Sequence, residues 1–145
     1  MGRAPLFDES AVARAEAALA SLADNFQPWL EAEVDKVQAA RESAVAEGWS
    51  DPALQALYNA AHDVKGLAAT YDYPFVTRLA ASLCRLIDTP AGKAAARARP
   101  TLVAAHVDAI RAAVRDRIKQ EDDPIARALI RALEAQVEEL GVAPR

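Results

Sequence analysis

Apolar residues recur three and four positions apart along most of the chain, which is the spacing of one face of an α helix. We find no convincing run of alternating apolar and polar residues, the pattern of a half-buried strand. The sequence therefore predicts an all-α chain. Long amphipathic helices joined by short turns pack as antiparallel neighbours, so we expect an up-and-down antiparallel four-helix bundle with one or two additional flanking helices.

The predicted helices are separated by glycine, proline and capping residues. They are Glu9 to about Asn25, Pro28 to near Gly48, Ser50 or Asp51 to the turn at Asp72–Pro74, the segment after that turn, Pro100 to about Lys119, and Asp122 or Asp123 to Gly141. The stretch Thr89–Arg99 is predicted to be the most loop-like part of the chain. We expect a single domain over residues 1–145, with a core bundle at about 28–119 and flanking helices at about 9–25 and 123–140.

Apolar stripes support each of these helices. The first carries Val12, Ala15, Leu19, Leu22 and Phe26, the fourth carries Val76, Leu79, Leu83 and Leu86, and the last carries Ile125, Leu129, Leu133, Val137 and Leu140. The stripe of the fourth helix is predicted to face inward.

Composition narrows the functional classes. The net charge is −4 and the pI about 5.2, which does not favour binding to nucleic acid or to an anionic membrane. A single cysteine, Cys84, excludes an internal disulfide and offers no set of metal ligands. The chain has no apolar run of membrane-spanning length, and acidic residues appear by Asp8, so a signal peptide is not expected. We therefore expect a cytoplasmic protein.

His62 stands out on the third predicted helix. One side of a helical wheel collects Ala53, Leu57, Ala60, Val64, Leu67 and Tyr71, and the side around His62 collects Gln55, Tyr58, Asn59, Lys65, Gly66 and Ala69. His62 is thus predicted to face solvent, where a neutral imidazole can act as a nucleophile. A phosphoryl group on its nitrogen brings a charge of about −2, which Lys65 at i+3 can reach. Gly66 leaves a gap beside the imidazole through which a partner can approach.

The other histidine, His106, provides a comparison. It lies among Val103, Val107, Ile110 and Val114 on its own wheel, so we expect it in the core or at its edge. No third ligand accompanies the two histidines on a shared face, and a metal site is not expected.

The stretch 57–88, LYNAAHDVKGLAATYDYPFVTRLAASLCRLID, resembles a histidine-containing phosphotransfer (HPt) domain. His62, Lys65 and Gly66 match the pattern His-x-x-Lys-Gly of that family. The small or apolar run and the leucines of the next helix also match, at Leu67, Ala68, Ala69, Leu79, Leu83 and Leu86. Asp72 stands in a turn where many members have glycine.

The resemblance implies that His62 accepts a phosphoryl group from a receiver-domain aspartate of a hybrid histidine kinase and passes it to a response regulator. The chain is then a phosphoryl carrier of two-component signalling and not a self-sufficient enzyme, because the receiver supplies Mg²⁺ and most of the catalytic charge. No cofactor is expected on this chain. The expected docking face around His62 consists of Gln55, Tyr58, Asn59, Lys65 and Ala69, together with part of the next helix. Arg78 and Arg85, seven positions apart on the next helix, are candidates to meet an acidic receiver rim.

Two other hypotheses remain open at this point. The chain can be a non-catalytic adaptor or scaffold bundle, in which His62 is replaceable. It can also be the dimerisation-type helical region of a histidine kinase. Asp63, directly after His62, resembles the acidic residue that follows the phospho-accepting histidine in those kinases. Six predicted helices in one chain favour a self-contained monomer over a two-chain bundle.

Overall fold

The computed structural model describes residues 8–119 and 123–141, and all regular secondary structure in these ranges is α-helical. The helices are α1 (Glu9–Ala46), α2 (Asp51–Thr70), α3 (Pro74–Ile87), α4 (Pro90–Ala98), α5 (Pro100–Arg115) and α6 (Pro124–Glu138). None of these helices combines the length and the apolar character needed to span a bilayer, within the described ranges. The predicted all-α class is confirmed, and α5 ends at Arg115, earlier than the expected Lys119.

Proline marks the start of each helix from α2 to α6, where it occupies the first turn. Proline suits this position because its missing N–H is not needed there. Three of these helices also have a side-chain cap at the preceding residue: Ser50 accepts from the Ala53 N–H, Thr89 from that of Gly92, and Asp123 from those of Ile125 and Ala126. The predicted cap at Ser50 and the alternative cap at Asp123 are confirmed, while Asp122 lies outside the described residues.

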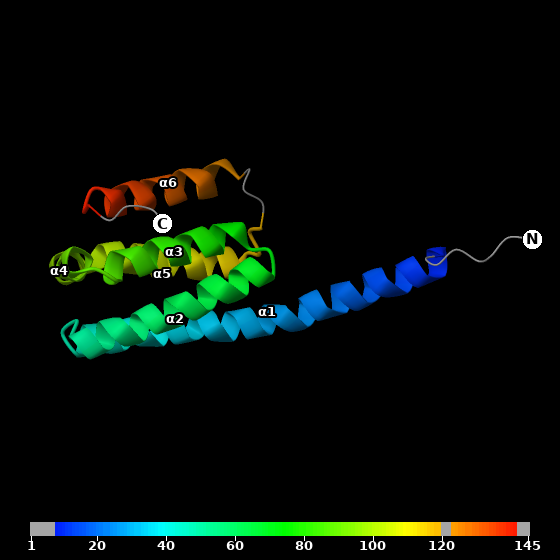
Figure 1. Ribbon diagram of the computed structural model, residues 1–145, viewed down its shortest axis with the longest axis horizontal. Coiled ribbons are helices and arrows are strands. Elements are labelled where there is room, and N and C mark those ends of the chain that lie inside the picture. Colours follow the sequence, from blue (N-terminus) through cyan, green and yellow to red (C-terminus); the bar gives the residue numbers. More distant parts are fainter. Residues whose placement is uncertain (1–7, 120–122, 142–145) are drawn as a thin grey trace, which may run out of the picture.

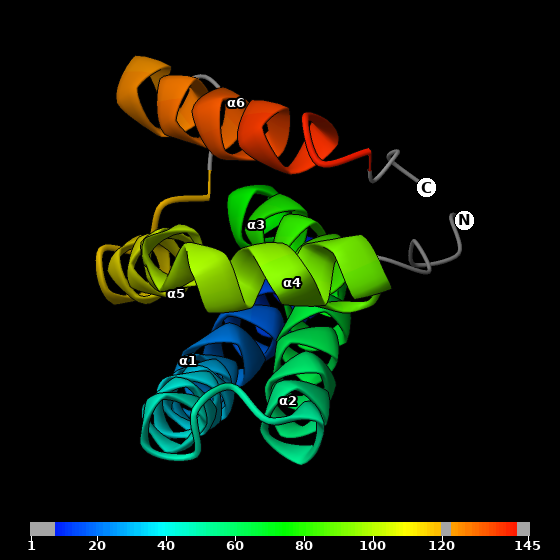
Figure 2. The same ribbon diagram turned by 90° about the vertical axis from the view of Figure 1, so that its left-hand side faces the viewer.

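Helix α3 occupies the centre of the structure. It packs against α2, α4, α5 and α6, and the C-terminal half of α1 lies beside α2 and α5 (Figures 1 and 2). The expected inward stripe of α3 is confirmed, since Val76, Leu79, Leu83 and Leu86 are buried. Figure 2 shows α4 crossing the end of the α3–α5 pair and α6 lying on the outer side of α3. In α6, Leu133 and Val137 are buried together with Ile130, whereas Ile125 and Leu129 remain exposed.

The expected break at Pro28 is wrong, because α1 continues through it from Glu9 to Ala46. A proline inside a helix removes the hydrogen bond to the carbonyl four residues earlier, here that of Asp24. Pro28 and Asp24 are both exposed, so water can satisfy the freed carbonyl. The flanking segment 9–25 is therefore the first half of α1 and not a separate helix. Figure 1 shows this half projecting beyond the packed helices.

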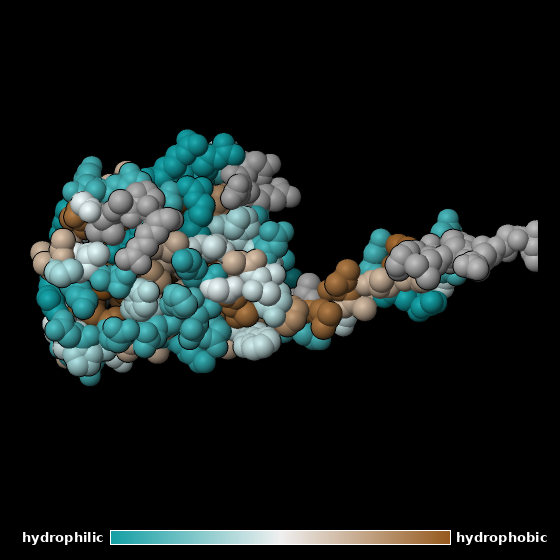
Figure 3. Space-filling view, viewed as in Figure 1, coloured by the Kyte–Doolittle hydropathy of each residue, from teal (hydrophilic) through white to brown (hydrophobic). Residues whose placement is uncertain are grey.

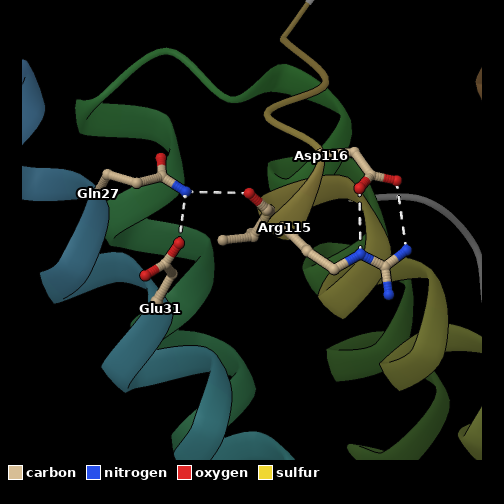
Figure 4. A network of polar contacts seen from close by, with 5 residues as sticks. Gln27, Glu31, Arg115 and Asp116 are labelled. Carbon is tan, nitrogen blue, oxygen red and sulfur yellow. Dashed lines mark hydrogen bonds and ion pairs between the residues drawn. The ribbon is translucent and has the colours of Figure 1, made fainter.

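Gln27 fixes α1 at the place where it leaves the packed helices. Its buried amide donates to the Val114 carbonyl at 3.0 Å and to the Glu31 carboxylate at 3.1 Å, and the Tyr73 hydroxyl donates to its oxygen. Figure 4 shows the first two bonds, with the exposed ion pair of Arg115 and Asp116 on the solvent side. Because Tyr73 precedes α3 and Val114 belongs to α5, one side chain joins three helices.

The expected loop at Thr89–Arg99 is also wrong, since α4 spans Pro90–Ala98. The Thr89 hydroxyl caps the helix through the Gly92 N–H at 3.0 Å, and alanine supplies most of the remaining turns. Gly92 lies where α4 meets the end of α3. A Cβ at this position would stand 1.5 Å from the Leu86 carbonyl oxygen, so the close approach of the two backbones requires glycine.

Candidate functional site

Helix α2 presents His62 on its outer face. The opposite side of the helix is anchored in the core by Leu54, Leu57, Ala61, Val64 and Ala68, all of which are buried. His62 is exposed, as predicted, and the ring of Tyr58 one turn earlier lies stacked beside it, with centroids 6.0 Å apart. The helix is therefore anchored by its buried face, while the imidazole on its outer face remains accessible.

An open hollow of about 170 Å³ lies between α2 and α3 at His62. Its lining from α2 is Tyr58, His62 and Lys65, and its lining from α3 and the C-cap of α3 is Ala81, Cys84, Arg85 and Asp88. The structure thus brings together His62, Lys65 and Arg85, which the sequence placed on two separate helices. Ala81, Cys84 and Asp88 were not predicted, although their spacing of three and four positions marks them as one face of α3.

Arg85, which lines the hollow, carries a buried polar atom that has no partner in the described part of the chain. Its Nε is buried and makes no hydrogen bond among the described residues. A buried donor without a partner is costly and needs an explanation, and a bound ion is one of the explanations that such an atom can have. The lining of the hollow contains two cations, Lys65 and Arg85, and one carboxylate, Asp88. The arrangement suits an anion at the imidazole.

Cys84 shares the hollow but does not compete with His62 as a nucleophile. Burial raises the pKa of its thiol to about 11, even though Lys65 nearby favours the thiolate. The thiol is therefore protonated at neutral pH, and a thiol is a far weaker nucleophile than a thiolate. The imidazole is the available nucleophile of the hollow.

Gly66 is not required by the packing of this chain. A Cβ at this position would meet no described atom within 4 Å, and the Thr70 hydroxyl, one turn later, donates to the Gly66 carbonyl at 3.0 Å. In contrast to Gly92, no atom of the described residues explains why a side chain is missing here. This leaves the approach of another molecule as a physical reason for the glycine.

The other candidate docking residues divide into two groups. Gln55, Asn59 and Ala69 are exposed on α2, and the Gln55 amide donates to Asn59 at 2.9 Å along the helix. Arg78 does not line the hollow. Instead, it forms an ion pair with Glu134 of α6 at 2.5 Å. Spacing placed Arg78 and Arg85 on one face of α3, but only Arg85 reaches the hollow beside His62.

His106 is a core histidine, as predicted. Its Nδ1 lies 2.8 Å from the Leu102 carbonyl, which can only accept, so Nδ1 carries the proton and Nε2 accepts from the Ser82 hydroxyl at 2.8 Å. Burial lowers its pKa, which keeps the ring neutral. Within the described ranges no three His, Cys, Asp or Glu side chains are grouped so that they could hold a metal ion.

Comparisons with protein-family models, with curated proteins and with solved structures give no match to this chain. The functional argument therefore depends on the geometry of the hollow and on the sequence pattern around His62.

Proposed function

We propose that this chain is a histidine-containing phosphotransfer protein in which His62 carries the phosphoryl group. The observation that carries the proposal is the hollow in which His62, Lys65 and Arg85 meet at an open face of α2. An accessible imidazole supplies the nucleophile, and the two cations lie where the transferred group would bring a charge of about −2. The open space at Gly66 lets a receiver domain approach the ring.

The transfer uses groups from both partners. A lone pair of the His62 imidazole attacks phosphorus, an N–P bond forms, and the P–O bond to the receiver aspartate breaks with its electron pair leaving on the carboxylate. The reverse step passes the group to the aspartate of a response regulator. Mg²⁺ belongs to the receiver partner, and Lys65 and Arg85 stabilise the phosphoryl charge electrostatically from this side.

The proposal includes a four-helix core made of α2, α3, α5 and the second half of α1. Contacts of α1 with α2 and α5, and of α3 with the same two helices, support this ring of four. In this arrangement α4 and α6 are additions on the outside. His62 then lies on a helix whose inner face is covered by its own chain, which supports a self-contained carrier over half of a kinase dimerisation bundle.

The backbone of the turn after α2 also supports the proposal. Asp72 has φ of 61°, the left-handed region that favours glycine and that aspartate tolerates. Many HPt domains have glycine in this turn, so the one departure from the family pattern keeps the backbone conformation that glycine would provide.

Phosphoryl acceptance tests the proposal directly. The purified chain is mixed with Mg²⁺ and phosphorylated receiver domains from the same cell, and any label on it is tested for acid lability and alkali stability. We expect labelled wild type and unlabelled, fully folded His62→Gln. Lys65→Ala should accept about tenfold more slowly, the equivalent of about 1.4 kcal/mol. Label that persists on His62→Gln, or no label from any receiver, would overturn the proposal and favour a non-catalytic adaptor.

A further inference from the structure

An apolar stripe runs along the projecting half of α1. Its residues are spaced alternately three and four apart, in the order Val12, Ala15, Leu19, Leu22, Phe26 and Trp29. Val12 is 40% exposed, Leu19 66%, Leu22 48% and Trp29 54%. Figure 3 shows the same feature as brown apolar surface on the rod that leaves the packed helices. An exposed stripe of this size on one helix marks an interaction surface.

The stripe follows the heptad rule of a coiled coil and stops where α1 enters the packed helices. The next positions in the same register, Glu33 and Lys36, are charged and pair with each other at 2.9 Å. At the inner end of the stripe, Phe26 stacks on Tyr71 with centroids 3.7 Å apart. There the stripe opens into a hollow of about 360 Å³ shared with the end of α2. The apolar stripe thus lies on the part of α1 that the other described helices leave exposed.

We propose that this stripe pairs with the same stripe of a second copy of the chain, in an antiparallel two-helix coiled coil. Side-chain sizes favour this partner and this direction. With the two-fold axis between Leu19 and Leu22, Val12 meets the partner's Trp29 and Ala15 meets the partner's Phe26. Each small residue then faces a large one, and Leu19 faces the partner's Leu22. A parallel pair would place Trp29 on Trp29 and Ala15 on Ala15, which leaves an uneven seam.

The charges beside the seam and the area that it would bury are both compatible with pairing of two copies of the chain. Glu16 is the one charged residue beside the seam positions, and antiparallel pairing keeps its two copies about 13 Å apart along the axis. A seam from Val12 to Trp29 is about 27 Å long. Two such seams bury on the order of 1,000 Å², the lower end for specific interfaces, so the dimer should dissociate on dilution. It differs from the expected monomer because the apolar stripe on the first half of α1 stays exposed among the described residues.

Sedimentation velocity of the full chain between about 1 and 100 µM tests the pairing without any phosphoryl transfer. We expect a concentration-dependent monomer–dimer equilibrium in wild type. Leu19→Glu with Leu22→Glu should shift it to monomer at all these concentrations, with unchanged helical content of the packed body. Ala13→Glu with Ala20→Glu adds the same charge on the opposite, exposed face of α1 and should leave the dimer intact. A wild-type chain that stays monomeric, or a dimer that survives the leucine changes, overturns the proposal.

A single cysteine at the start of the seam tests the direction. In the antiparallel pair the two copies of Glu9 lie about 35 Å apart, far beyond the reach of a disulfide. Glu9→Cys should therefore remain uncrosslinked under oxidation while the dimer is present in the same sample. Efficient crosslinking between copies would show a parallel pair and contradict the antiparallel arrangement.

Discussion

His106 of α5 and Ser82 of α3 are joined by a 2.8 Å hydrogen bond, and neither side chain is exposed to solvent. The ring also donates to the Leu102 carbonyl, so both of its nitrogens are satisfied in the neutral form. Burial lowers the pKa of His106, and Arg85 nearby acts in the same direction, while the bond to Leu102 and the charge of Glu134 oppose the shift.

This burial predicts a pH dependence of stability. The unfolded chain binds a proton on His106 near the ordinary pKa of histidine, about 6.5, whereas the folded chain resists it. The stability contribution is therefore present above about pH 6.5 and is lost as the pH falls toward the lowered pKa of the folded state. The slope is at most about 1.4 kcal/mol per pH unit.

Urea unfolding at about pH 7 and about pH 5.5 measures this slope. Wild type should lose stability at the lower pH, and His106→Gln should be less stable at pH 7 but show a flatter dependence. His62→Gln removes the exposed histidine and is the matched control for the loss of one imidazole. Equal slopes in wild type and His106→Gln would contradict the assignment.

Gly92 and Gly66 predict opposite responses to the same substitution. Gly92→Ala forces a Cβ against the Leu86 carbonyl, so the α3–α4 junction must shift and stability should fall by about 1–3 kcal/mol. Gly66→Ala adds a methyl group in open space inside a helix and should raise stability by up to about 1 kcal/mol. Urea unfolding of both variants checks the pair, and changes of the same sign would contradict the packing described for one of them.

Helix α4 shows which part of the fold could be predicted from the sequence. Thr89–Pro90 has the same cap-and-proline start as Ser50 to Pro52 and Asp123–Pro124, and five helices begin with proline in the first turn. The segment was nevertheless expected to be a loop because its alanines form no long apolar stripe. At Pro28 the opposite error occurred, because a helix end was predicted where α1 continues. A proline on the exposed side of a long helix does not have to end it.

The exposure of the candidate site residues could be predicted from the sequence, but their neighbours on other helices could not. Helical periodicity is a local property, so it placed His62 outward and His106 inward correctly. The choice of neighbouring helices depends on residues that are distant in the sequence. Arg78 and Arg85 share one predicted face of α3, but only Arg78 forms an ion pair with α6. Likewise, the stripe on the first half of α1 was visible, but its exposure depends on where the other helices end.

Gly66→Leu tests whether the missing side chain serves an approaching receiver. The variant should remain folded, because no atom in the described part of the chain lies within 4 Å of a Cβ at this position, but it should accept phosphoryl at least tenfold more slowly. Ala56→Leu adds similar bulk to an exposed position of α2 about 120° around the helix from His62 and is the control. Normal acceptance by Gly66→Leu would remove the docking explanation for this glycine.

Arg85 and Arg78 provide a matched pair of cation removals on one helix. Arg85→Gln removes a positive charge from the hollow of His62 and should slow phosphoryl acceptance by about tenfold, a loss of about 1.4 kcal/mol in the transition state. Arg78→Gln makes the same change in net charge but breaks an ion pair with Glu134, so it should lower stability by at most about 1 kcal/mol and leave the rate within about twofold. Single-turnover transfer from one phosphorylated receiver, with urea unfolding alongside, separates the two effects. Equal slowing by both variants would mean that the receiver senses the overall charge of α3, and the specific role of Arg85 beside His62 would be lost.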